Sequence, residues 1–174
     1  MNKKFIKDKF FKVKLAIFDF DGVFTDNKVL VSQLGVESVL CCRSDGIGIS
    51  RLSSIGIKSY VISSETNPIV RVRCEKLKIP VIQGVVDKRK AIEDLCNSIS
   101  ISPKDCLFLG NDINDINAFQ IVGYPIAVAD AYEEINDYVI YKTKRKGGNG
   151  AVREICDLIF NLSLIHISEP TRRY

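Results

Sequence analysis

Two aspartates, Asp19 and Asp21, stand one residue apart directly after the apolar run Leu15 to Phe18, within LAIFDFDGVFTD. Four consecutive apolar residues predict a strand that is buried on both faces, as in a parallel sheet. Two like charges at the end of such a strand repel each other and lose hydration. We therefore expect a cation beside them, most simply a metal ion that one carboxylate ligates while the other remains free for proton transfer.

The spacing of the two carboxylates suits phosphoryl transfer. Residues two apart on a strand point the same way and lie about 6.6 Å apart, so both aspartates could face one reacting centre. Asp19, at the strand end, is placed to act as a nucleophile that forms an aspartyl-phosphate. Asp21 could protonate the leaving alkoxide and then deprotonate the attacking water. Gly22 would let the backbone approach the phosphoryl oxygens closely.

Other polar residues could balance the charge of a phosphoryl group. Lys88 offers a point charge, Ser63 a hydroxyl donor, and the amides near Phe20 to Val23 an anion-binding nest. Mg²⁺ would bridge Asp19 and the phosphate, with Asn111 or Asp112 as the candidate for the remaining ligand. Taken singly, such residues are more often a solvated lysine, a turn residue or a helix cap, but here all of them follow predicted strands.

Apolar runs alternate with segments of helical spacing along most of the chain. We predict strands at 15–18, 59–62, 80–83, 106–109, 126–129 and 138–141. We predict helices at 44–54, 68–77, 87–98 and 116–122, and a closing helix after the glycine-rich loop 147–150. This order indicates an α/β fold, a doubly wound (Rossmann-like) parallel sheet with helices on both faces, in which ligands bind outside the carboxyl ends of the strands.

Two local features accompany this framework. Two β-like runs, Lys28 to Gln33 and Val36 to Cys41, meet at Leu34-Gly35 and predict a hairpin, either projecting from the domain or lying at a sheet edge. Ser44-Asp45-Gly46 offers an N-cap for the helix that follows it.

Length and composition indicate one compact domain of 174 residues, 46% of them hydrophobic. The net charge of +4 is concentrated at the ends, because residues 1–14 hold six lysines against one aspartate. Nothing suggests nucleic-acid binding. We expect a basic leader over 1–14, packed through Phe5, Phe10 and Phe11, then a phosphatase domain over 15–162 and a tail over 163–174.

The six cysteines show neither CxxC spacing nor a nearby histidine partner, which favours reduced thiols in a cytosolic protein. The sequence lacks the apolar core of a signal peptide and any run long enough to span a membrane. We therefore expect a cytoplasmic protein with no membrane partner. The segment 163–174 breaks the helical pattern and resembles translated sequencing-adapter read-through, so we assign no function to His166.

The strand-end residues resemble the haloacid dehalogenase superfamily of phosphatases. DFDGVFTD is similar to its first motif, Ser63 to its second, Lys88 to its third and GNDINDI at 110–116 to its fourth. Within the superfamily the chain looks like the small capless phosphatases of 2-keto-3-deoxy sugar acids. Their members act on octulosonate 8-phosphates or nonulosonate 9-phosphates, or form the phosphatase-like domain of acylneuraminate cytidylyltransferases. The resemblance spans roughly residues 14–162, with RSDGIGI, QGVVDK, VADA and GGNGAVREICDL among the shared segments.

The resemblance implies a Mg²⁺-dependent homotetramer with no separate cap domain, in which the hairpin after the first motif covers a neighbour's active site. It also implies that Asp19 is nucleophile and metal ligand, that Asp21 is the acid/base and ligates through its carbonyl, and that Ser63 and Lys88 bind phosphate. Two positions depart from the family. Asn111 replaces the usual aspartate ligand, so either its amide oxygen or Asp112 would bind the metal. Ser44 replaces a common basic residue, leaving Arg43 to supply that charge.

Substrate choice would depend on Glu65, Arg73 and Lys76, which look like the set of the nonulosonate branch. An exposed helix with ordinary charged residues explains the same pattern about equally well, and of the two substrate lengths we favour a nine-carbon sugar acid 9-phosphate. Two other functions remain open at this point. One is a catalytically silent tetramerisation module that supports a cytidylyltransferase, which Asn111 would favour. The other is a phosphoacceptor signalling domain, against which Asp21 argues because it is placed to activate water.

Overall fold

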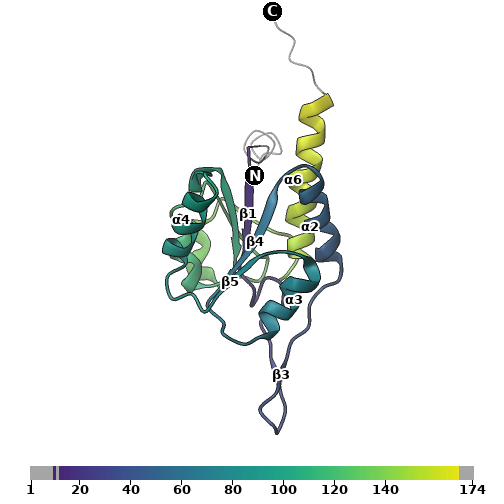
Figure 1. The fold of residues 1–174 in the computed structure, drawn as a ribbon, viewed down its shortest axis with the longest axis vertical. Helices are drawn as coiled ribbons and strands as arrows, with labels where there is room; N and C mark the ends of the chain where they lie inside the picture. Colours follow the sequence, from purple (N-terminus) through teal and green to yellow (C-terminus); the bar gives the residue numbers. More distant parts are fainter. Residues whose placement is uncertain (1–9, 11, 169–174) are drawn as a thin grey trace, which may run out of the picture.

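The structure is a computed structural model that describes residue 10 and residues 12–168. Its core is a six-stranded parallel sheet in the order β5-β4-β1-β6-β7-β8. Helix α4 covers one face of the sheet and α2, α3 and α6 cover the other (Figure 1). The predicted doubly wound α/β fold is confirmed.

The sheet strands are β1 (Leu15–Phe18), β4 (Lys58–Ser63), β5 (Val81–Gln83), β6 (Cys106–Gly110), β7 (Tyr124–Ala127) and β8 (Tyr141–Lys142). The α-helices are α2 (Ser44–Ser54), α3 (Ile69–Leu77), α4 (Lys88–Ser98), α5 (Ile116–Phe119) and α6 (Ala151–Ser168). Three 3-10 helices are η1 (Pro103–Asp105), η2 (Ile113–Asp115) and η3 (Glu133–Tyr138). A separate hairpin pairs β2 (Leu30–Val31) with β3 (Glu37–Ser38).

Strand β1 lies in the middle of the sheet, as its apolar sequence predicts. It pairs in parallel with β4 on one side and β6 on the other, and all four of its side chains are fully buried. The strands that precede Ser63 and Asn111 are therefore its direct neighbours. This topology brings the ends of three strands, and the residues after them, to one edge of the sheet.

The last two strands differ from the prediction. β7 covers 124–127 rather than 126–129, in a register that pairs Leu107 with Tyr124. β8 begins at Tyr141 rather than 138, because residues 133–138 form η3 before the chain rejoins the sheet. Apolar content alone located these strands to within a few residues, whereas pairing with β6 and β7 set their bounds.

The hairpin projects from the same edge of the sheet to which the strand ends point (Figure 1). Its strands are only two residues each, shorter than predicted, and all four of their residues are exposed. Large apolar side chains on the hairpin face solvent, Leu34 being 90% exposed. Of the two arrangements that the sequence left open, the projecting one is observed.

The cap of α2 is not the one that the sequence predicts. Arg43 occupies the N-cap position and makes no side-chain hydrogen bond to the helix. The carboxylate of Asp45 instead accepts a hydrogen bond from the backbone of Arg153, at the start of α6. The reason is tertiary, because α2 packs along α6 and brings Asp45 to donors that its own helix does not offer.

The predictions for the two ends of the chain are confirmed in part. Phe10 is buried against Tyr124 and Tyr141, which confirms one contact of the predicted leader, whereas Phe5 and Phe11 lie outside the described residues. Helix α6 continues to Ser168, so the predicted break of helical pattern at residue 163 is wrong. A helix already formed over three turns extends at little further cost. Within the part of the chain that the structure describes, no helix has the length and apolar character to cross a bilayer.

Candidate active site

A cavity of about 300 Å³ opens at the carboxyl edge of the sheet. Five residues that the sequence predicted for the site line it, namely Asp19, Asp21, Ser63, Asn111 and Asp112. Glu65, predicted as a substrate contact, lines it as well. They come from the ends of β1, β4 and β6, so the expectation that these strand-end groups form one site is met.

Lys88 lies beneath this cavity in a buried triad of charges. Its ammonium Nζ is 2.7 Å from Asp19 Oδ2 and 2.7 Å from Asp115 Oδ1. The side chains of Lys88 and Asp115 are 2% and 0% exposed, respectively. Asp19 Oδ1 accepts a hydrogen bond from the amide of Phe20 at 2.7 Å. Asp19, the predicted nucleophile, is thus held on both carboxylate oxygens.

The triad carries one more negative than positive charge when both acids are ionised. Burial and, after it, the charge of the Asp115 carboxylate raise the pKa of Asp19 to about 7 against the opposing effect of Lys88. Burial would lower the pKa of Lys88, but the two carboxylates together raise it above its usual value. The ammonium is therefore charged, and one uncompensated carboxylate charge remains to attract a further cation.

Asp21 lies at the solvent side of the same turn. Partial burial raises the pKa of Asp21, and the nearby Glu65 carboxylate raises it further. A carboxyl group that holds its proton more tightly than usual suits the donation of a proton to a leaving group. The two aspartates of the first motif therefore occupy different environments, one fixed by an ammonium and one open to the cavity.

The turn after Asp21 is closed by its own hydrogen bonds. Thr25 is buried, and its Oγ1 accepts from the amides of Gly22 at 3.1 Å and Asn27 at 3.2 Å. The amide of Val23 donates to Phe20 O. The predicted anion nest over 20–23 is therefore largely committed within the turn, and among its amides only that of Asp21 has no partner in the described chain.

The side chain of Asn111 lies against Gly22. Gly22 has a φ of +75°, and a Cβ there would collide with the side-chain amide of Asn111. Asn111 is buried, lines the cavity and makes no side-chain hydrogen bond to the described residues. Its amide oxygen is thus available beside the backbone of the first motif.

The side chain of Asp112 is engaged elsewhere. Its Oδ1 accepts from the amide of Ile113 at 2.7 Å, as the N-cap of η2. Asp115 completes this capping box and also accepts from the amide of Asn111 at 2.8 Å. Asp115 was not among the predicted site residues, so its role as the partner of Lys88 was missed. The D-x-x-D spacing signalled the cap, but nothing in the sequence signalled the ion pair.

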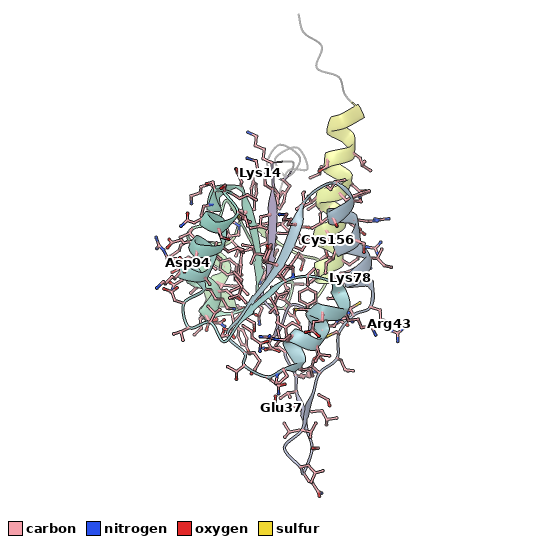
Figure 2. All side chains as sticks on the ribbon, in the orientation of Figure 1. Lys14, Glu37, Arg43, Lys78, Asp94 and Cys156 are labelled. Carbon is pink, nitrogen blue, oxygen red and sulfur yellow. The ribbon has the colours of Figure 1, made fainter. Side chains whose placement is uncertain are left out.

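A second cavity of about 270 Å³ adjoins the first and shares Asp21, Asn27 and Glu65 with it. Lys28, Glu37 from the hairpin and Asn67 also line it, and Asn67 Nδ2 donates a hydrogen bond of 2.9 Å to Glu37 Oε2. Figure 2 shows Glu37 on the hairpin below α3. Glu37 was not among the predicted site residues, because a single acid in an exposed hairpin carries no sequence signal.

Three predicted substrate contacts lie away from both cavities. Arg43 is exposed and extends outward at the side of the domain (Figure 2). Lys76 is exposed on α3. Arg73 donates from Nη2 to Cys42 O at 3.0 Å, which turns its guanidinium toward the start of α2. Within one chain, only Glu65 of the predicted specificity set lies at the active-site cavity.

The residues at the cavity suit a hard, oxygen-binding cation. Asp19, Asn111 and the backbone of Asp21 supply oxygens, and the triad supplies the excess negative charge. No cluster of three or more Asp, Glu, Cys or His side chains occurs with metal-binding geometry among the described residues. A metal here would therefore use amide, carbonyl and water oxygens alongside a carboxylate, the donor set that Mg²⁺ accepts.

A parallel α/β sheet with an acid pair after its central strand and a lysine beneath it defines a class of hydrolases. The family described as haloacid dehalogenase-like hydrolase matches residues 56–155. The chain belongs to this family, and it is a phosphatase.

The chain is similar to the 3-deoxy-D-manno-octulosonate 8-phosphate phosphatase KdsC of Escherichia coli strain K12, with 34% identity over 148 residues, 84% of this chain and 79% of that protein. A structure of the corresponding phosphatase from Moraxella catarrhalis, in complex with magnesium, phosphate and KDO, has a TM-score of 0.89 and 30% identity, covering 96% and 98% of the two chains. A cobalt-bound form from Haemophilus influenzae has a TM-score of 0.85 and 31% identity, covering 89% and 91%.

Proposed function

We propose that this phosphatase hydrolyses the terminal phosphate ester of a 2-keto-3-deoxy sugar acid through an aspartyl-phosphate on Asp19. The observation that carries the proposal is the buried Asp19–Lys88–Asp115 triad, which opens into a cavity lined by Asp21, Ser63 and Asn111. The triad orients one carboxylate oxygen of Asp19 and keeps a cation beneath it. Three relatives, in E. coli, M. catarrhalis and H. influenzae, are named for this type of substrate, and the latter two share the fold.

Mg²⁺ is the proposed cofactor. Asp19, the carbonyl of Asp21 and the amide oxygen of Asn111 would hold it, because Asn111 lies against Gly22 while Asp112 caps η2. When bound, the ion would neutralise charge on the transferring phosphoryl group. The magnesium in the M. catarrhalis structure supports this choice, and the cobalt in the H. influenzae structure is consistent with a divalent-ion site.

The chain's own residues would divide the reaction into two steps. Asp19 attacks phosphorus, and Asp21 gives its proton to the sugar oxygen as the phosphorus–oxygen bond breaks. Asp21, now ionised, then takes a proton from the water that attacks the aspartyl-phosphate, which frees phosphate and restores Asp19. Lys88 and the Ser63 hydroxyl hold the phosphoryl oxygens during both steps. The raised pKa of Asp21 supports its role as the first proton donor.

The eight-carbon substrate, 3-deoxy-manno-octulosonate 8-phosphate, is our first candidate, and the relatives support it. Glu65 favours a nine-carbon nonulosonate 9-phosphate, because an acidic side chain at the cavity suits a longer hydroxyl-bearing tail. Arg73 and Lys76 add little to that second candidate, since neither lines either cavity in a single chain.

We further propose that the protein assembles as a homotetramer through the hairpin, and that it acts in the cytoplasm. Exposed apolar side chains on the hairpin lie on β2, in the turn and on either side of β3, a pattern typical of an interaction surface. All six cysteines are free thiols, which suits a reducing compartment. Arg43 and Lys76, which are exposed in one chain, would be free to reach a neighbour's cavity.

Phosphate release from the eight- and nine-carbon acids, with and without Mg²⁺, tests the proposal. We expect turnover only with the metal, a higher kcat/KM for the eight-carbon ester, and loss of at least about a thousandfold in kcat for Asp19→Asn. Asp94→Asn, an exposed acid on α4 (Figure 2), is the matched control and should behave as wild type. Equal activity of Asp19→Asn and wild type would disprove the mechanism.

The same assay addresses the non-catalytic alternative, a tetramerisation module for an acylneuraminate cytidylyltransferase. An inactive wild type that binds such a partner tightly would favour it. A long-lived aspartyl-phosphate without turnover would instead favour a phosphoacceptor. The Asp19–Lys88 contact and the position of Asp21 at the cavity both support turnover.

A further inference from the structure

Asp45 is a fully buried acid that the proposed reaction does not use. It lies in the first turn of α2, and one of its carboxylate oxygens, Oδ2, is buried with no hydrogen-bond partner among the described residues. A buried carboxylate is costly to keep, so its position calls for an explanation.

The other oxygen of Asp45 reaches a second helix. Oδ1 accepts a hydrogen bond of 3.1 Å from the amide of Arg153, the third residue of α6. An amide in the first turn of a helix has no partner within that helix, so an acid from outside serves as its cap. Gly48 permits this contact, because a Cβ there would press on Cys156 and on the backbone of Arg153. Figure 2 shows Cys156 between α6 and α2.

The segment just before α6 touches the catalytic turn. The amide of Gly148 donates to Val23 O at 3.0 Å. A Cβ on Gly147 would overlap Gly22 O, and one on Gly148 would overlap the backbone of Thr25 and Asp26. Backbone therefore packs on backbone here, and any shift of the start of α6 moves the turn that carries Asp21.

Arg73, on α3, is a further neighbour of Asp45. Its positive charge acts on Asp45, and its Nε is a second buried atom without a partner among the described residues. The guanidinium of Arg73 is held by Cys42 O, at the return of the hairpin. Asp45 thus interacts with α6 through a hydrogen bond, whereas it interacts with α3 only through the charge of Arg73.

We propose that Asp45 is a positioning residue of the active site, which fixes the start of α6 and thereby holds the loop 147–150 against the turn 22–26. The inference rests on the proposed function for its effect on catalysis, but its structural part does not depend on substrate. The acid acts through the backbone of α6 and the glycine loop, and it touches no reacting group.

Three variants test the proposal. Asp45→Ala removes the acceptor for Arg153 and should lower kcat about 10- to 100-fold with KM within about threefold, since displacement of a catalytic group by about 1 Å costs that much. Asp45→Asn retains an acceptor oxygen and should keep kcat within about threefold. Ile159→Ala is the control, because it removes a fully buried side chain from α6 without touching the cap. It should lower the melting temperature but leave kcat unchanged below that temperature.

Hydrogen exchange at the amide of Gly148 supplies a readout that needs no substrate. We expect faster exchange at Gly148 in Asp45→Ala than in wild type, and no such change in Asp45→Asn or Ile159→Ala. If Asp45→Ala does not fold, Asp45→Ser replaces it, because the shorter hydroxyl falls short of Arg153. Unchanged exchange and kcat in the folded variant, or equal losses in Ile159→Ala, would overturn the proposal. An inactive wild type would reject the proposed function while the exchange result still decides this inference.

Discussion

The catalytic edge of the sheet and the hairpin that projects beside it are built in opposite ways. At the edge, Asp19 is held by the ammonium of Lys88 and by the amide of Phe20, in the interior of the domain. In the hairpin, β2 carries Leu30 and Val31 into solvent, and β3 is joined to the body of the domain by the hydrogen bond between Asn67 and Glu37.

This difference indicates that the edge of the sheet serves the chemistry and that the hairpin serves recognition. The phosphoryl-transfer groups need fixed positions within a few tenths of an ångström, which the rigid ends of three paired strands provide within one chain. The hairpin has little to hold it in the isolated chain, so its final position depends on what covers it. The predictions below test whether the edge is complete in one chain and whether the hairpin needs a second copy.

The largest effect is expected at the triad. Asp115→Asn removes one of the two charges that hold Lys88, so kcat should fall about 10- to 100-fold, as for partners that orient a catalytic site. The remaining Lys88–Asp19 pair is balanced in charge, so the free energy of unfolding should fall by about 1 to 3 kcal/mol, the cost of a weakened hydrogen bond to a buried charged group. Steady-state kinetics and chemical denaturation measure the two effects. Wild-type kinetics would show that the edge does not depend on the triad.

The choice of metal ligand at the same edge is tested with two variants. Asn111→Asp adds a negative charge beside Asp19, so the Mg²⁺ concentration for half-maximal activity should fall about tenfold. Asp112→Asn is the matched variant, and it should shift that concentration by less than about threefold because Asp112 caps η2. A larger shift in Asp112→Asn than in Asn111→Asp would assign the metal to Asp112 instead.

The hairpin is tested through its exposed leucines. The double variant Leu30→Ser, Leu34→Ser should lower the molar mass in size-exclusion chromatography with light scattering and raise KM severalfold. At a concentration low enough for wild type to be monomeric as well, the two melting temperatures should agree, since both side chains are exposed in the single chain. Val72→Ser alters an exposed apolar residue on α3 and should change neither property. An unchanged mass in the double variant would remove the hairpin from the interface.

Asp45, in the first turn of α2, is expected to make the stability of the fold depend on pH. Burial raises the pKa of Asp45 to about 6, against the opposing charges of Arg73 and Arg153, with the thiols of Cys41 and Cys156 also nearby. The folded state thus holds this proton more tightly than the unfolded state, whose pKa is near 3.8. This contribution to stability is fully present below pH 3.8 and is lost as the pH rises through about 6.

Asp45→Asn cannot ionise and should escape that loss. The difference in unfolding free energy between Asp45→Asn and wild type should therefore move in favour of the variant between pH 4 and pH 8, by about 3 kcal/mol at most. Denaturant unfolding across this range measures it. A difference that does not change with pH would show that Asp45 is ionised without penalty in the folded protein.

Much of the site followed from local chemistry. An apolar run that ends in two carboxylates predicted β1, Asp19 and Asp21, because a buried strand has no other use for paired charge at its end. The rule that ligands meet the carboxyl ends of parallel strands then placed Ser63 and Asn111 with them, and the cavity confirms that placement. The end of α2 at Ser54 was also predicted, although its N-cap was not.

The missed features share one physical cause. Three hydrogen bonds were missed, those of Asp115 with Lys88, Asp45 with Arg153 and Glu37 with Asn67. Each joins residues that are 27 or more positions apart in the sequence. An acid that caps its own helix and an acid that caps another have the same local sequence. Propensity and spacing describe neighbours along the chain, whereas these contacts depend on which helices pack together.

The sequence by itself therefore determined the elements, their order and the edge at which chemistry would occur, because strand burial and strand polarity are local properties. Only the tertiary structure decided which charges neutralise one another, since Lys88 could have faced phosphate alone and instead lies between Asp19 and Asp115. It also decided that the side chain of Asn111 lies against Gly22, because Asp112 is engaged as the N-cap of η2.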